Sequence, residues 1–239
     1  MTATIKILMV LTSHGAMGDT GKPTGVWFEE VATPYYAFVD AGAQVDVVSI
    51  QGGKVPIDPR SLKPAGENGV TVDRFLKDAS AMRKIEVSLK IDQVTARGYD
   101  AVFLPGGHGT MWDLPKSGTL GDLLSTAWRS GKVVAAVCHG PAGLVNAKDE
   151  TGRPIVAGRR VSGFTDSEEE AAGLTNTVPF LLEARLRKLG ARFEGGPDYQ
   201  PYAVRDGRLV TGQNPASSEE VARLTLQAIS EAAVPAAAE

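Results

Sequence analysis

The chain alternates between short apolar runs and longer segments in which apolar residues recur every three or four positions. A run that is apolar at nearly every position is typical of a strand buried on both faces of a sheet. Recurrence at three or four positions is typical of a helix that packs with one face. The predicted strands cover residues 5–11, 44–50, 99–104, 132–137 and 208–211, and the predicted helices cover 25–41, 120–130, 178–189 and 214–229.

Strands that are separated by helices predict a mainly parallel sheet with helices on both faces, which is the doubly wound α/β class. We expect a single domain over residues 1–231, followed by a flexible tail over 232–239. Residues 51–70 are rich in glycine and proline and are predicted to form a loop. A loop of this length is unusual inside a compact domain, so we expect it to line a site.

The composition of the chain argues against nucleic-acid binding, a membrane span, disulfide bonds and a structural zinc site. The chain has 239 residues and a net charge of −3, which gives no general attraction to nucleic acid or to an anionic membrane. No apolar run approaches the ~20 residues that a membrane helix needs, and the N-terminus does not read as a signal peptide. A single cysteine forms no internal disulfide, so we expect a reducing, cytoplasmic compartment. Three histidines without a Cys/His cluster argue against a structural zinc site.

That single cysteine, Cys138, directly follows the predicted strand 132–137 and precedes His139. Catalytic nucleophiles of α/β proteins often occupy such a strand-to-helix turn, which is tight and needs small residues two positions away on either side. Here those residues are Ala136 and Gly140. The N-terminus of the next helix is expected to lower the thiol pKa, and His139 supplies a base and a backbone N–H for an oxyanion.

The alternative for Cys138 is a buried structural cysteine, since free cysteines are among the most buried residues. The small flanking residues and His139 favour the nucleophile.

A glycine-rich segment, Gly106-Gly107-His108-Gly109, follows the predicted strand 99–104. It lacks both the spacing of a dinucleotide-binding loop and the lysine of a phosphate-binding P-loop. The backbone N–H of Gly107 is a candidate oxyanion donor beside Cys138, because loops at the carboxyl ends of parallel strands meet at one edge of the sheet. A simple turn remains the alternative.

Glu29 and Glu30 are neighbours on the predicted helix 25–41. The apolar stripe of that helix consists of Trp27, Val31, Tyr35 and Phe38. Glu30 lies at the edge of the stripe and Glu29 points nearly opposite to it. We therefore predict that Glu30 enters a pocket and shares a proton with the sulfur, while Glu29 is solvated.

Two further candidates carry weaker signals. Residues 166–170 (DSEEE) are expected to be a solvated run or a helix N-terminus, although one member could orient His139 as the third group of a Cys–His–acid set. His14 follows the first predicted strand, near the expected cleft, and is interpreted as an exposed loop residue.

Taken together, these segments resemble the DJ-1/PfpI superfamily, and within it the Hsp31-like group that includes glutathione-independent glyoxalases (glyoxalase III). The nucleophile segment is specific to the superfamily, and the TGRP and GFTD segments point to the subgroup. The resemblance covers nearly the whole chain and rests on Thr24-Gly25-Val26 followed by Glu30, on 107–110 (GHGT), 135–141 (AAVCHGP), 151–154 (TGRP), 163–166 (GFTD) followed by Glu169, 206–212 (DGRLVTG) and 214–217 (NPAS).

The resemblance implies a flavodoxin-like fold, a homodimer and a conversion of methylglyoxal to lactate that needs no cofactor and no metal. The zinc-bearing form of the family has extra segments that this chain lacks. By position, the resemblance assigns the nucleophile to Cys138, the histidine to His139, the thiol-bonding acid to Glu30 and the third member to Glu169, with Gly107, His108 and His139 as substrate or oxyanion contacts.

The expected substrate is a small α-oxoaldehyde that forms a hemithioacetal with Cys138. Two alternatives remain open from the sequence. One is a cysteine hydrolase, such as a peptidase, amidase or deglycase, that uses the same nucleophile. The other is an Hsp31-type chaperone or stress protein in which an easily oxidised thiol acts as a sensor.

Overall fold

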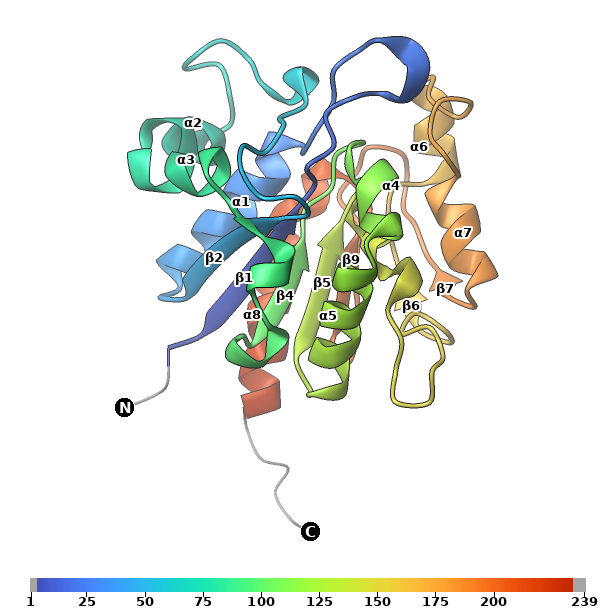
Figure 1. Ribbon diagram of the computed structural model, residues 1–239. Coiled ribbons are helices and arrows are strands. Elements are labelled where there is room, and N and C mark those ends of the chain that lie inside the picture. The colour runs from blue at the N-terminus through green and yellow to red at the C-terminus, as the bar shows by residue number, and fades with distance from the viewer. Residues whose placement is uncertain (1–3, 234–239) are drawn as a thin grey trace.

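In the computed structural model, which describes residues 4–233, a seven-stranded sheet runs through the middle of the molecule (Figure 1). Its strand order is β3-β2-β1-β4-β5-β9-β8, and every neighbouring pair is parallel except the pair of β8 and β9. The strands are β1 (Lys6–Leu11), β2 (Gln44–Ser49), β3 (Leu89–Lys90), β4 (Ala101–Leu104), β5 (Val133–Val137), β8 (Ala203–Asp206) and β9 (Leu209–Gly212). A separate parallel pair is formed by β6 (Arg160–Val161) and β7 (Arg192–Phe193).

Helices cover both faces of this sheet, as the alternating pattern predicts. Helices α1 and α8 pack against each other on one face, and α5 packs on β4 and β5 from the other face (Figure 1). The helices are α1 (Phe28–Asp40), α2 (Val70–Lys77), α3 (Ala79–Glu86), α4 (Thr110–Asp113), α5 (Gly118–Arg129), α6 (Asp166–Ala171), α7 (Leu182–Lys188) and α8 (Ser218–Ala233). Short 3₁₀ segments include η2 (Pro59–Ser61), η6 (Gly140–Asn146) and η7 (Pro215–Ser217).

The central strands are apolar because both of their faces are covered. All five residues of β5 and all four residues of β4 are buried. Helix α1 buries Val31, Tyr35 and Phe38 of its predicted apolar stripe, whereas Trp27 precedes the helix and is half-buried. None of the helices in the described part of the chain is long and apolar enough to cross a membrane.

The doubly wound α/β prediction is confirmed, and the predicted strands differ from the observed ones by one or two residues at their ends. Three helices begin later than predicted, and the last of them, α8, covers Ser218–Ala233 rather than 214–229. Helix α1 begins at Phe28 rather than at Gly25, because Val26 pairs with the loop residue Ile57. Helix α7 begins at Leu182 rather than at position 178. Helices α2 and α3 follow the glycine- and proline-rich segment and were not predicted.

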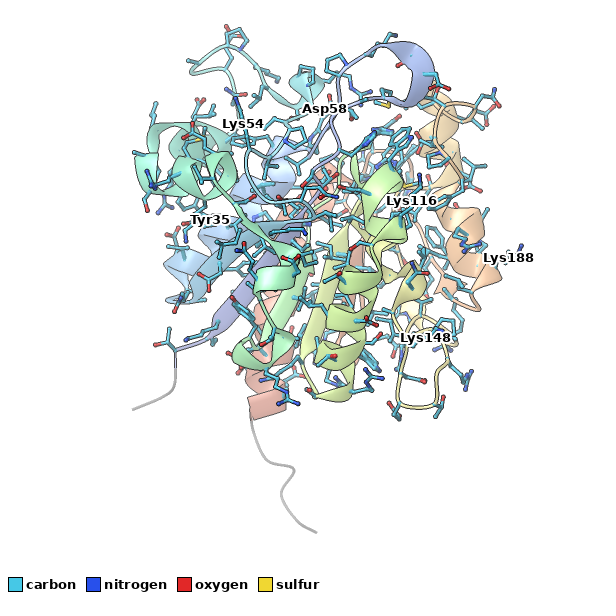
Figure 2. The ribbon with its side chains drawn as sticks, viewed as in Figure 1. Tyr35, Lys54, Asp58, Lys116, Lys148 and Lys188 are labelled. Atoms are coloured by element: carbon cyan, nitrogen blue, oxygen red, sulfur yellow. The ribbon has the colours of Figure 1, made fainter. Side chains whose placement is uncertain are left out.

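The topology of the sheet brings together the loops that follow β1, β4 and β5. The chain leaves the carboxyl ends of β1, β4 and β5 at the edge of the sheet that is uppermost in Figure 1. The loop over 51–69 also folds over this edge, where Asp58 is labelled in Figure 2. Residues 234–239, most of the predicted tail, lie outside the described residues.

The turn after β5 leaves no room for a side chain at Gly140, since a Cβ there would overlap with the carbonyl oxygen of Leu104. We predict that Gly140→Ala lowers the free energy of unfolding by about 1–3 kcal/mol, the usual cost of overpacking. Urea unfolding measures this difference. The control is Gly118→Ala at the start of α5, where a Cβ meets no atom within 4 Å. Equal stability of both variants and the wild type would contradict this view of the turn.

Candidate active site

Cys138 occupies a strained turn between β5 and η6. Its φ of 59° lies in the left-handed region, which costs a residue other than glycine about 1–3 kcal/mol. Hydrogen bonds hold it on both sides: its N–H donates to the carbonyl oxygen of Gly212 (2.9 Å), and its carbonyl oxygen accepts from the N–H of Phe164 (2.8 Å). Both neighbouring segments thus fix the backbone that carries the sulfur. The sharp strand-to-helix turn expected from the sequence is confirmed.

Glu30 points from α1 into the same region and is fully buried, whereas Glu29 is exposed, as the helix phase predicts. Its Oε2 accepts a hydrogen bond from the backbone N–H of Gly106 at 2.7 Å. Burial raises the pKa of Glu30 to about 8, against the opposing effects of the Gly106 N–H and of the adjacent Cys138 side chain. Near neutral pH, Glu30 is therefore mostly a neutral acid that can exchange a proton at the sulfur.

Burial also raises the pKa of the Cys138 thiol well above its ordinary value, and the charge of Glu30 raises it further. The backbone N–H of Gly107 opposes this by stabilising the thiolate. The expectation that a helix N-terminus gives a lowered thiol pKa was therefore wrong. The segment after Cys138 is the 3₁₀ helix η6, and desolvation of the buried sulfur is the largest influence on the thiol pKa.

His139 links the sulfur to a carboxylate. Its Nδ1 lies 3.3 Å from Sγ of Cys138, and its Nε2 lies 2.8 Å from Oε2 of Glu169. Although burial raises the pKa of Glu169, hydrogen bonds from His108 and His139 lower it to about 2, so Glu169 is ionised. A carboxylate accepts hydrogen bonds only, so Nε2 of His139 carries the proton and Nδ1 offers a lone pair to the thiol.

His108 is a second partner of the same carboxylate. Its Nε2 lies 2.9 Å from Oε1 of Glu169, and its ring centroid lies 4.1 Å from that of His139. Burial first and the neighbouring His139 second lower the pKa of His108 to about 4, so this ring is neutral at physiological pH. The resemblance placed His108 in the substrate-contacting set, but did not predict its bond to Glu169.

Arg60 is a further residue of the site, and it was not predicted from the sequence. This residue lies in η2, within the segment 51–70 that was expected to line a site, and its Nη2 is 3.2 Å from Nδ1 of His108. Asp58 is fully buried and accepts two hydrogen bonds from the guanidinium, at 2.9 and 2.6 Å. Thr24 donates a further hydrogen bond to Asp58 at 2.9 Å. The glycine and proline content of the segment indicated a loop near a site, but did not single out Arg60.

The acidic run 166–170 forms the start of α6, and two of its members are buried rather than solvated. Thr165 caps the helix by accepting from the N–H of Glu168 at 3.0 Å. Glu168 accepts hydrogen bonds from Asn214 and from the backbone of Tyr199, each at 2.8 Å, and so ties three segments together. Its neighbour Glu169 is thereby held against the two histidines.

His14 lies outside this cluster. Its ring is half-buried and stacks on Trp112, with ring centroids 5.3 Å apart, and its Nε2 bonds to the carbonyl oxygen of Ala16. We give it no role in the site.

One side-chain group has a composition that could hold a metal ion. The ligand atoms of His108, His139 and Glu169 lie within 4.8 Å of one another. Both histidine Nε2 atoms, however, are hydrogen-bonded to the carboxylate. A metal would have to replace both bonds and take their protons, so the geometry favours proton transfer for these groups.

Comparison with known proteins agrees with this geometry. A model of the DJ-1/PfpI family matches residues 24–228. The chain belongs to the DJ-1/PfpI family. Several curated relatives match over almost their whole length. Glutathione-independent glyoxalase HSP31 of Saccharomyces cerevisiae is 37% identical over 94% of this chain and 98% of its own. Glyoxalase 3 of Candida albicans is 33% identical over 91% of this chain and 95% of its own.

Solved structures share the fold. The crystal structure of glyoxalase III from Candida albicans has a TM-score of 0.85 and 32% identity, and covers 94% of this chain and 97% of its own. The Rapid Encystment Protein 24 KDa of Francisella tularensis has a TM-score of 0.90 and 37% identity, covering 95% and 99%. The membership of this family that was expected from the sequence motifs is confirmed.

The pairing of Glu30 with the thiol is testable without a substrate. Glu30→Gln removes the negative charge that raises the thiol pKa, so we predict that this pKa falls by about one unit or more. The measurement is the rate of iodoacetamide alkylation of the single cysteine as a function of pH. Glu29→Gln, a change on the exposed neighbour, should leave the profile unchanged. A profile that moves to higher pH in Glu30→Gln would refute the pairing.

Proposed function

We propose that this protein is a glutathione-independent glyoxalase that converts methylglyoxal, or a related α-oxoaldehyde, to lactate or the corresponding 2-hydroxy acid. The observation that carries the proposal is the buried set of Cys138, His139 and Glu169 with Glu30 beside the sulfur. The relatives named above carry the glyoxalase name and match this chain over nearly its full length. No cofactor is needed, because oxidation at one carbon balances reduction at its neighbour.

In the first step the thiol of Cys138 attacks the aldehyde carbon. Because burial keeps the thiol protonated, a base must take its proton, and Nδ1 of His139 at 3.3 Å is in position. A carbon–sulfur bond forms and the aldehyde becomes a hemithioacetal. The backbone N–H of Gly107, which faces the sulfur, is the donor that we assign to the developing oxyanion.

In the second step the former aldehyde carbon loses its proton and the adjacent ketone carbon gains one. We assign this transfer to Glu30, since a carboxyl with a pKa of about 8 both accepts and donates protons near neutral pH. An enediol forms and then collapses to a thioester of the 2-hydroxy acid. Water hydrolyses the thioester, which releases the acid and restores the thiol.

Among the alternatives, a hydrolase would use the same Cys138–His139–Glu169 set. Glu30 distinguishes the two reactions, because amide or ester hydrolysis needs no proton transfer between adjacent carbons. No feature of residues 4–233 favours a chaperone over an enzyme. We further propose one domain over residues 1–231 and, from the family resemblance, a homodimer. The single cysteine supports a cytoplasmic location.

The direct test is lactate formation from methylglyoxal in the absence of glutathione. We predict turnover by the wild type and a loss of at least about 10³-fold in Cys138→Ala, which lacks the attacking sulfur. Glu30→Gln should still bind the aldehyde at sulfur but form little lactate. Lactate production at the wild-type rate by the Cys138→Ala protein would refute the proposal.

Glu169 provides a second test. Glu169→Gln keeps the size of the side chain but removes the charge that orients His139, so we predict that kcat/KM for methylglyoxal falls by about 10²–10⁴-fold. The matched control is Glu170→Gln, the exposed next residue, which should retain wild-type kinetics. Equal activity of the two variants would show that Glu169 does not support the reaction.

A further inference from the structure

The site contains one connection that the proposed chemistry does not use. It runs from Asp58 through Arg60 and His108 to Glu169. Glu169 therefore divides its two oxygens between His139, which faces the sulfur, and His108, which does not. A change in the charge of His108 therefore alters how strongly the Glu169 carboxylate interacts with His139.

Arg60 determines which nitrogen of His108 carries a proton. A guanidinium only donates hydrogen bonds, so Nδ1 of His108, at 3.2 Å, must accept one. The proton of a neutral ring is then on Nε2, where it is donated to Glu169. The same contact prevents a second proton from binding at Nδ1, because that position already faces a permanent cation.

The guanidinium is itself fixed in place. Asp58 binds both its Nε and its Nη2, and Asp58 is fully buried and bonded to Thr24. Arg60 is only half-exposed, with 45% of its side chain accessible. In the described part of the chain, it is the one lysine or arginine that hydrogen-bonds to a member of the set His108, His139, Cys138 and Glu169. Its position therefore follows from the buried carboxylate and not from a chance surface contact.

We propose that Arg60 is a positioning residue, which keeps His108 neutral and its Nε2–H on Glu169 so that the charge of Glu169 remains available to His139. The inference rests on the proposed function for its kinetic consequence, but not for its effect on the thiol. A protonated His108 would pair with Glu169 as a full cation beside His139, at a ring separation of 4.1 Å. His139 would then accept the thiol proton less readily, because like charges repel.

The groups that face His108 determine whether removal of Arg60 raises or lowers the pKa of His108. Arg60 approaches Nδ1 from η2, Glu169 approaches Nε2 from α6, and His139 lies beside the ring from the turn after β5. Arg60 and His139 oppose protonation of His108, and Glu169 favours it. Removal of Arg60 therefore raises the pKa of His108, and the cation appears on the acidic side of neutrality.

The experiment compares Arg60→Met, Arg60→Lys and wild type by the pH dependence of Cys138 alkylation and of kcat/KM for methylglyoxal. We expect the acidic limb of both profiles to move to higher pH in Arg60→Met, with a larger loss near pH 6 than near pH 8. Arg60→Lys retains a cationic hydrogen-bond donor for Nδ1 of His108, so its acidic limb should lie at the pH of the wild-type limb. Arg74→Met, which removes an exposed arginine paired with Asp40, is the matched control and should match the wild type.

The same substitution in a His108→Gln background separates positioning from simple structural support. Glutamine can donate to Glu169 but does not titrate, so only the direct attraction of Arg60 to Cys138 and Glu169 remains in this background. Arg60→Met should then move both limbs less than it does in the presence of His108. An equally large shift in this background, or an equal loss at every pH in Arg60→Met alone, would overturn the proposal.

The protonation of His108 can also be observed in the unaltered protein. In ¹⁵N NMR spectra of the wild type near pH 7, we expect His108 to carry its proton on Nε2 and to have a bare Nδ1. A proton on Nδ1 would refute the inference without any variant. Because NMR and alkylation use no aldehyde, they test Arg60 even if methylglyoxal is not a substrate.

Discussion

The carboxylate of Glu169 is the contact on which the arrangement around Cys138 depends. It is buried, ionised, and accepts one hydrogen bond from each of two histidines. A buried charge is tolerated only when it is fully hydrogen-bonded, and here both oxygens are used. The capping box of Thr165 and the bonds of Glu168 to Asn214 and Tyr199 hold α6 in place. The charge therefore sets the orientation of His139, and His139 presents its lone pair to the sulfur.

The second constraint is the burial that Cys138 and Glu30 share. Desolvation raises the pKa of both groups, so the resting site keeps a neutral thiol beside a mostly neutral acid. A neutral thiol is a weak nucleophile, so the attack that we propose requires a base to deprotonate Cys138. The same property makes Glu30 able to move a proton in either direction near neutral pH. The fold produces this property of Glu30, because the orientation of α1 that packs Val31 and Tyr35 into the core also buries Glu30.

The sequence predicts those parts of the structure that depend only on neighbouring residues in the chain. Apolar runs identified the strands, helix phase distinguished Glu30 from Glu29, and the small residues around Cys138 indicated its turn. It did not reveal the depth of burial, so the direction of the thiol pKa was wrong. Nor did it reveal Arg60, because the contact with His108 joins loops that are 48 residues apart. Contacts between loops depend on how the sheet arranges them, which no local pattern contains.

The most direct test of the central claim is to identify the atom that methylglyoxal bonds during turnover. Wild-type protein is mixed with methylglyoxal, quenched rapidly in acid and mapped by peptide mass spectrometry, with hydroxylamine added to half of the sample. We predict an adduct of one methylglyoxal mass on Cys138, which hydroxylamine releases as lactohydroxamate. Lactate production with Cys138 unmodified at every time point would contradict it.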